Sequence, residues 1–162
     1  MRNLDGKKVD FNEFIKDKNA VIIFLPKIGK SAEFLPKELL GMSGLTGCSG
    51  QCKIYQNELE KFKQKGYEIY AISSLNVSDM SEFKRLLGVS FEFFSDEEFE
   101  LENLLNLKTI NTSDGKKFYH RQTLIFKDGK LAKRLEFIAK PNEDANSVLK
   151  LLIDKFNKRS KI

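Results

Sequence analysis

Apolar residues along this 162-residue chain gather in short groups, and the spacing within each group changes between the strand and helix periods. Residues 20–25 form a continuous apolar run rich in β-branched side chains, which predicts a strand buried on both faces, and residues 68–73 predict a second one. Between them, apolar positions after Gly50 recur at helical spacing as far as Gly66, a suitable helix stop. A strand, a helix and a strand in this order imply parallel neighbouring strands.

The middle of the chain continues this alternation. Residues 77–87 place their apolar side chains on one helical face, and residues 90–94 predict a short strand. Ser95, with Glu98 three residues later, has the spacing of a capping box, which predicts a short helix that runs to Leu105. These residues extend the predicted sheet by one strand and add two helices.

In the last third of the chain, strands and helices no longer alternate. Residues 121–126 and 131–137 predict two antiparallel strands, joined by a hairpin turn at residues 127–130. Pro141 and Asn142 introduce a final helix that should pack back on the sheet. The apolar face of this helix consists of Val148, Leu149, Leu152 and Phe156.

The order of these elements predicts an α/β fold of the thioredoxin-like class, in which helices flank both faces of a central mixed β-sheet. We expect residues 1–162 to form a single domain, because the length suits one hydrophobic core and no linker is visible. Residues 27–47 are rich in Gly, Ser, Lys and Leu and predict a long loop, with one helical turn over residues 33–40. Long loops inside compact domains tend to be functional.

Composition and charge argue against membrane-embedded and nucleic-acid-binding functions. Hydrophobic residues make up 41% and charged residues 31%, and no run of about 18 apolar residues could cross a bilayer. The N-terminus lacks the apolar region of a secretory signal, so we expect a cytoplasmic protein without a membrane partner. The net charge is +5, but 23 acidic residues are interleaved with the basic ones, and the basic cluster at residues 155–161 suits a solvated helix end. Nucleic acid is therefore not an expected partner.

The candidate chemistry lies in two cysteines, Cys48 and Cys52, at the start of a predicted helix. In a reducing compartment, so close a pair is more often catalytic or metal-binding than a structural disulfide. A zinc site is not expected, because His120 is the single histidine and no third cysteine occurs. A helix N-terminus favours the thiolate, which is the reactive form of cysteine. The plain alternatives are a buried cysteine without chemistry and, for Cys52, a passive helix residue.

The segment around Cys48 suits a small polar substrate, because Gly47 and Gly50 allow a close backbone approach and the hydroxyls of Thr46 and Ser49 can form hydrogen bonds with it. This segment is one of several short motifs whose order and spacing carry a family resemblance. The motifs are residues 5–11, 24–26, 47–51, 71–73, 94–97 and 120–130. Through them the chain resembles the peroxiredoxins of the AhpC/TSA superfamily, specifically the bacterioferritin-comigratory-protein or Q type, over most of its length.

The resemblance implies a thiol-dependent peroxidase for hydrogen peroxide or organic hydroperoxides. Cys48 would attack the peroxide and become a sulfenic acid, and Cys52 would be the resolving cysteine. Arg121 would hold the thiolate and polarise the peroxide, since a fixed guanidinium offers several donors to developing charge; otherwise it is a surface charge at a strand start. The resemblance also implies no metal or other cofactor, a thioredoxin-like reductant, and a monomer, with a dimer as the alternative.

The chain departs from the family signature in the residues around the reactive cysteine. The family has a proline seven residues before this cysteine and a hydroxyl residue three before it, where this chain has Gly41 and Leu45. Thr46, one position later, is then the expected hydroxyl. Cys52 follows Cys48 by four residues instead of the usual five, so a disulfide between them would require the helix to unwind locally.

Two other functions stay open on the sequence. A thioredoxin-like disulfide reductase has a similar fold but uses a C-x-x-C pair and a facing cis-proline, whereas this chain has C-x-x-x-C and no proline between Pro36 and Pro141. A peroxiredoxin-like binding or regulatory module without catalytic activity fits the altered residues Gly41 and Leu45.

Overall fold

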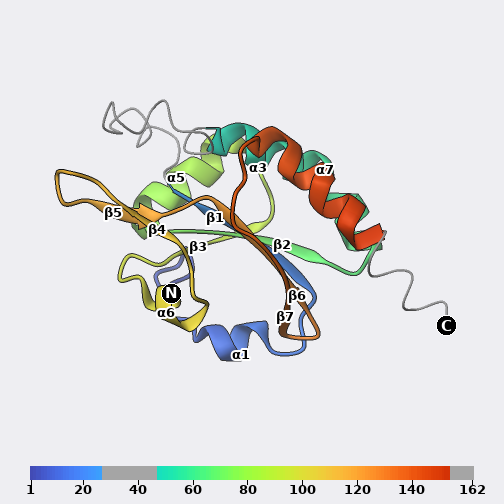
Figure 1. Cartoon of the computed structure of the whole chain (residues 1–162), viewed down its shortest axis with the longest axis horizontal. Helices are drawn as coiled ribbons and strands as arrows, with labels where there is room; N and C mark the ends of the chain where they lie inside the picture. Colours follow the sequence, from blue (N-terminus) through green and yellow to red (C-terminus); the bar gives the residue numbers. More distant parts are fainter. Residues whose placement is uncertain (27–46, 154–162) are drawn as a thin grey trace.

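A five-stranded mixed sheet forms the centre of the structure, a computed structural model that describes residues 1–26 and 47–153 (Figure 1). Its strands lie in the order β3-β2-β1-β6-β7. The neighbours β1, β2 and β3 are parallel, whereas β6 is antiparallel to β1 and β7 is antiparallel to β6. The strand bounds are β1 (Ala20–Leu25), β2 (Glu68–Ser73), β3 (Glu92–Ser95), β6 (Gln122–Lys127) and β7 (Lys130–Leu135).

Helices cover both faces of this sheet (Figure 1). They are α1 (Phe11–Ile15), α3 (Cys48–Asn57), α4 (Leu59–Gln64), α5 (Val77–Leu87), α6 (Glu100–Leu104) and α7 (Pro141–Leu151). Residues of α3, α4, α5 and α7 share one hydrophobic core with Val21, Ile23 and Leu25 of β1. Residues of α1 and α6 share a second core with Ala20, Ile22 and Phe24. Successive β1 side chains thus enter opposite cores, which confirms the predicted arrangement of helices on both faces.

The predicted helix is present with Cys48 at its start, but it is divided. Cys48 is the first residue of α3, and the chain leaves helical geometry at Glu58 before α4 begins. The stacked rings of Tyr55 and Phe62, whose centroids are 5.5 Å apart, show that both halves face the same core. The helix over Val77–Leu87 has its predicted bounds and ends at Gly88, whose φ of 68° suits glycine.

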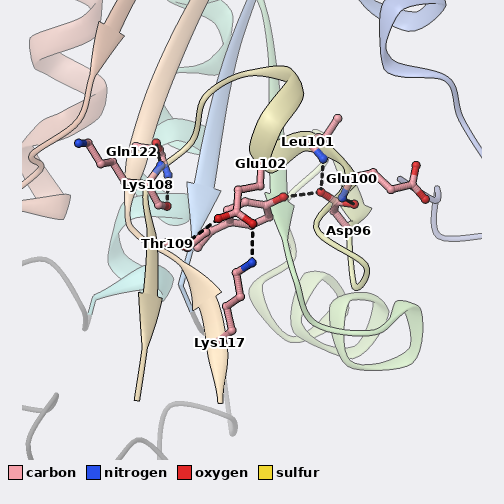
Figure 2. Close-up of polar contacts among 9 residues, drawn as sticks. Asp96, Glu100, Leu101, Glu102, Lys108, Thr109, Lys117 and Gln122 are labelled. Atoms are coloured by element: carbon pink, nitrogen blue, oxygen red, sulfur yellow. Dashed lines mark hydrogen bonds and ion pairs between the residues drawn. The ribbon is translucent and has the colours of Figure 1, made fainter. Parts of the chain in front are cut away.

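The prediction of a capping box at Ser95 and Glu98 is wrong. Ser95 is the last residue of β3, paired with Ser73, and its hydroxyl donates to the carbonyl of Leu75. The start of α6 is capped by Asp96 instead, whose carboxylate accepts the backbone N–H groups of Glu100 and Leu101, each at 3.0 Å (Figure 2). Ser95 takes part in strand pairing, and Phe99, the N-cap residue of α6, has no side-chain cap, so the Asp96 carboxylate accepts the first N–H groups of the helix.

Several short elements escaped the sequence analysis. Near the N-terminus, Arg2 and Lys8 form an isolated antiparallel bridge, and α1 follows it. A separate two-stranded sheet pairs β4 (Thr109–Asn111) with β5 (Lys117–Tyr119). The Glu102 carboxylate of α6 holds both strands, since it accepts from the Thr109 hydroxyl at 3.0 Å and from the Lys117 ammonium (Figure 2).

Some predictions fall on residues that the structure does not describe. The helical turn over 33–40, the apolar side chain of Phe156 and the basic cluster at 155–161 lie outside the described residues. Over residues 1–26 and 47–153, no helix has the length and apolar character needed to span a membrane.

The hairpin glycines provide a test of the fold. At Gly129 (φ +79°), between β6 and β7, an added Cβ would lie 2.7 Å from the backbone nitrogen of Asp17, whereas at Gly115 (φ +85°) it would meet open space. Both alanine variants carry the left-handed backbone penalty, but only Gly129→Ala also forces a clash. We expect Gly129→Ala to lower the free energy of unfolding by about 1 kcal/mol or more beyond Gly115→Ala. Denaturant unfolding measures the difference, and equal losses would contradict it.

Candidate active site

The antiparallel pairing of β1 with β6 brings two distant parts of the chain to one edge of the sheet. Phe24, near the end of β1, pairs with Gln122, the first residue of β6. Arg121 directly precedes this pair and therefore lies beside the carboxyl end of β1. Cys48, which opens the next described helix along the chain, reaches the same edge, because its sulfur contacts Arg121. The sheet topology thus brings together Cys48 and Arg121, two of the residues that the sequence indicates.

Cys48 and Arg121 form the centre of the site. The guanidinium Nη2 donates to the Cys48 Sγ at 3.2 Å, with Arg121 0% and Cys48 6% exposed. A buried cation is costly unless an anion or acceptors surround it, so the contact favours Cys48 as thiolate. The helix start adds to this, since the first turn of α3 directs unpaired backbone N–H groups toward its N-terminus. The alternative reading of Arg121 as a surface charge is wrong.

Glycine shapes the entry into α3. Gly47, the residue before Cys48, has a φ of +95°, which L side chains rarely adopt. A Cβ on Gly50 would lie 2.2 Å from the Asn142 side-chain oxygen, so the first turn of α3 packs closely against the first turn of α7. The two glycines therefore set the position of Cys48 between the sheet and α7.

Gln51 contacts a second nitrogen of the Arg121 guanidinium. Its side-chain Oε1 accepts from Arg121 Nη1, and its Nε2 donates to Asp144 Oδ2 at 3.1 Å. A guanidinium can only donate and a carboxylate can only accept, so these neighbours fix which end of the amide faces Arg121. Gln51 is fully buried, and the sequence analysis did not single it out.

Asp144 was also missed, although the sequence contains a signal for it. It stands four residues before Val148 and eight before Leu152, on the apolar face of α7, where a carboxylate is out of place. Its Oδ2 accepts from the Tyr55 hydroxyl at 2.6 Å and from Thr123 Oγ1 at 2.8 Å, in addition to Gln51. Burial raises the pKa of the Asp144 carboxyl, and these hydrogen bonds and the charge of Arg121 oppose that rise.

Cys52 lies one helical turn beyond Cys48 and is fully buried in the core. Burial raises the pKa of its thiol far above the ordinary value, the nearby Cys48 raises it further, and Arg121 lowers it. Cys52 is therefore a neutral thiol at physiological pH, and no disulfide joins it to Cys48. The two cysteines differ in environment although they share one helix.

The other residues that the sequence indicated are not part of the Cys48–Arg121 contact. Thr46, Gly41 and Leu45 lie outside the described residues, so the structure does not test the role expected of Thr46. Ser49 is exposed on the first turn of α3. The His120 Nδ1 lies 3.0 Å from the Arg121 carbonyl oxygen. Among the residues that the structure describes, no three His, Cys, Asp or Glu side chains gather in a way that could hold a metal.

The sequence of this chain is similar to a known family. The AhpC/TSA family profile matches residues 42–134, a stretch that contains Cys48, Cys52 and Arg121. The chloroplastic peroxiredoxin Q of Oryza sativa subsp. japonica and the putative chloroplastic peroxiredoxin Q of subsp. indica are each 30% identical over 97 residues, or 60% of this chain. The match spans 37% of the length of each of these proteins.

Solved structures give the fold independently. Peroxiredoxin Q of Xanthomonas campestris matches with a TM-score of 0.74 and 19% identity, covering 95% of this chain and 89% of that one. The peroxidoxin BcpB of Mycobacterium tuberculosis matches with a TM-score of 0.73 and 15% identity, covering 96% and 91% of the two chains. These likenesses confirm the predicted thioredoxin-like α/β fold.

The contrast between the two cysteines predicts selective alkylation. In the native protein, we expect iodoacetamide to modify Cys48 at least about tenfold faster than Cys52, because only the thiolate reacts and Cys52 is a buried neutral thiol. Peptide mapping by mass spectrometry after timed quenching measures both rates. In denaturant the two rates should become similar, and equal rates in the native protein would contradict the assignment.

Cys52 also predicts a pH dependence of stability. Its thiol has an ordinary pKa of 9.0, which burial raises in the folded state, so above that pH the unfolded chain releases a proton that the folded chain keeps. The free energy of unfolding should therefore fall as the pH rises, by up to about 1.4 kcal/mol per pH unit. Denaturation of the parent and Cys52→Ala between about pH 8.5 and pH 10 measures the slope.

Cys52→Ala should reduce this slope, whatever it does to the stability at neutral pH. Tyr55, Tyr67, Tyr70 and Tyr119 also have raised pKa values, so their contribution in the same direction begins above about pH 10. Both proteins share this contribution, apart from the small part of the Tyr55 shift that comes from Cys52. Parallel curves for parent and variant would show that Cys52 titrates normally in the folded state.

Proposed function

The chain belongs to the AhpC/TSA family, and on this premise we propose that it is a thiol-dependent peroxidase with Cys48 as the peroxidatic cysteine. The observation that carries the proposal is the 3.2 Å contact between the buried Arg121 guanidinium and the Cys48 sulfur at the N-terminus of α3. A thiolate next to a fixed guanidinium has both the nucleophile and the donors that cleavage of an O–O bond needs.

In the first half-reaction, the Cys48 thiolate attacks one peroxide oxygen. An S–O bond forms as the O–O bond breaks, so the sulfur loses two electrons and the peroxide is reduced. The leaving oxygen takes up a proton and departs as water or as an alcohol, and Cys48 becomes a sulfenic acid. The Arg121 guanidinium donates hydrogen bonds to the negative charge that develops on the leaving oxygen.

In the second half-reaction, Cys52 is the resolving cysteine. Its thiol attacks the sulfenic sulfur of Cys48, a disulfide forms, and water leaves. The neutral, buried Cys52 must first become accessible, so the first turns of α3 unwind from the core. Gly47 and Gly50 lower the cost of that local unwinding, because glycine tolerates many backbone conformations.

A dithiol protein of the thioredoxin type would complete the cycle by reducing the Cys48–Cys52 disulfide through thiol exchange. We assign the protein to the cytoplasm, where such reductants keep thiols reduced. The cycle needs no second copy of the chain, because both cysteines belong to one helix, so a monomer suffices.

A binding or regulatory module without peroxidase activity is the second candidate. It is favoured by one sequence observation, the presence of Gly41 and Leu45 where the family signature has a proline and a hydroxyl residue. These residues belong to the substrate side of the site in the family, so their replacement would weaken peroxide binding. Direct reaction with peroxide separates the two candidates.

We expect the fully reduced protein to lose two hydrogens within minutes of adding one equivalent of hydrogen peroxide, as seen by intact mass spectrometry. Cys52→Ser should gain one oxygen instead, because its sulfenic acid has no resolving thiol, and Cys48→Ser should stay unchanged. Trapping with dimedone would identify the oxygen adduct. An unchanged parent mass would exclude the peroxidase and leave the module without catalytic activity.

A further inference from the structure

A buried carboxylate stands next to the peroxidatic centre, and the reaction as described makes no use of it. Asp144, in the first turn of α7, is 4% exposed. Its Oδ2 atom accepts three hydrogen bonds from buried side chains: Gln51 at 3.1 Å, Tyr55 at 2.6 Å and Thr123 at 2.8 Å. One oxygen that accepts three donors is the pattern of an ionised carboxylate.

We propose that Asp144 is a positioning residue for the peroxidatic centre, which orients the Gln51 amide so that Gln51 in turn holds the Arg121 guanidinium against Cys48. The inference rests on the proposed function, in which Arg121 stabilises the Cys48 thiolate. It gives Asp144 the role of holding Arg121 in place. It extends the site from the sheet edge into α7.

The polarity of the Gln51 side chain carries the first step of the argument. An amide can rotate and exchange its oxygen and nitrogen ends, and only the oxygen end can accept from Arg121. The carboxylate of Asp144 accepts the Nε2 end and so selects the productive orientation. Without an acceptor on α7, the amide could present its NH2 group to the guanidinium, where donor would face donor.

The second step is that Asp144 connects the two elements that carry the site. Gln51 and Tyr55 belong to α3, which begins at Cys48, and Thr123 belongs to β6, two residues after Arg121. Donors from both elements therefore meet on one oxygen atom. The relative position of α3 and β6 sets the distance between the Cys48 sulfur and the guanidinium.

The third step is the cost of this arrangement. Asp144 lies on the apolar face of α7, where an apolar residue would continue the core. A buried carboxylate there is disfavoured by desolvation, and replacing such groups by apolar residues is often neutral or stabilising. Packing alone thus gives no reason for a charge at this position, whereas orientation of Gln51 and Arg121 does.

Positioning and plain electrostatics predict opposite effects on Cys48. As a mere negative charge, Asp144 would oppose the Cys48 thiolate, so its removal would favour the thiolate. As a positioning residue, its removal would release Arg121 and disfavour the thiolate. Among the residues that the structure describes, the ionisable groups that interact with this cluster include Arg121, Tyr55, Cys48 and Cys52, and Tyr55 and Cys52 are kept neutral by burial. The sign of the change therefore distinguishes the two roles.

The test uses Asp144→Leu, which lacks an acceptor, and Asp144→Asn, whose neutral amide oxygen is a weaker acceptor than the carboxylate. Both are made in the Cys52→Ser protein, and the pH dependence of iodoacetamide alkylation gives the midpoint of thiolate formation at Cys48. We expect Asp144→Leu to raise this midpoint by at least about one pH unit, a tenfold loss of thiolate below the midpoint, and Asp144→Asn to raise it less. The second-order rate constant for hydrogen peroxide should fall in the same order.

Asp96 provides a matched control. It is also a buried aspartate, and it accepts from the Tyr119 hydroxyl and from the backbone N–H groups of Glu100 and Leu101 (Figure 2), but it belongs with α6 on the other face of the sheet. Asp96→Leu and Asp96→Asn should reduce stability without moving the Cys48 midpoint. An equal shift in both pairs of variants would reduce the effect to general destabilisation and overturn the proposal.

A double-mutant cycle tests the route through Gln51. If Asp144 acts through that amide, Asp144→Leu should change the midpoint little once Gln51→Leu is present, whereas additive shifts would overturn the route. An unchanged or lowered midpoint in the Asp144 variants would overturn positioning as a whole, and Asp144→Asn decides alone if Asp144→Leu does not fold. Failure of the protein to consume peroxide would refute the proposed function. The alkylation experiment would still test the role of Asp144, because alkylation needs no peroxide.

Discussion

The buried guanidinium of Arg121 is the group on which the arrangement of this site depends. A cation with no solvent exposure must find its acceptors inside the protein, and here they include the Cys48 sulfur and the Gln51 amide oxygen. Each of these acceptors sits on the first turn of α3, so the requirement of one side chain sets the position of a helix. The charge that needs neutralising also makes the cysteine reactive, because it stabilises the thiolate form.

The fold supplies this geometry through the direction of its strands. Three parallel strands place helix starts at their carboxyl ends, and the antiparallel β6 brings its first residues to the same edge. The cysteine therefore approaches from a helix start and the arginine from a strand start. The other face of the sheet, covered by α1 and α6, contributes a separate core and none of the groups that contact Arg121 through a described hydrogen bond.

The proposed turnover conflicts with the stability of α3. Its first turns are packed against α7 through Gly47 and Gly50, and Cys52 is a buried neutral thiol in the core. These contacts hold Cys48 next to Arg121, yet the proposed disulfide between the two cysteines would require the same turns to leave the core. The glycines serve both states, because they permit close packing in one and a change of backbone conformation in the other.

The sequence by itself determined the order of strands and helices, the mixed sheet between two helical layers, and the pairing of Cys48 with Arg121 through a family resemblance. Periodicity determined the elements because each strand or long helix buries its own apolar pattern. Periodicity failed for α1 and the β4–β5 hairpin, because their few residues give too short a pattern. The capping-box prediction failed at Ser95, because this residue pairs with Ser73 in the sheet. Only the tertiary structure identified Gln51 and Asp144, because a buried polar residue is defined by partners that are distant in sequence, and no local spacing encodes them.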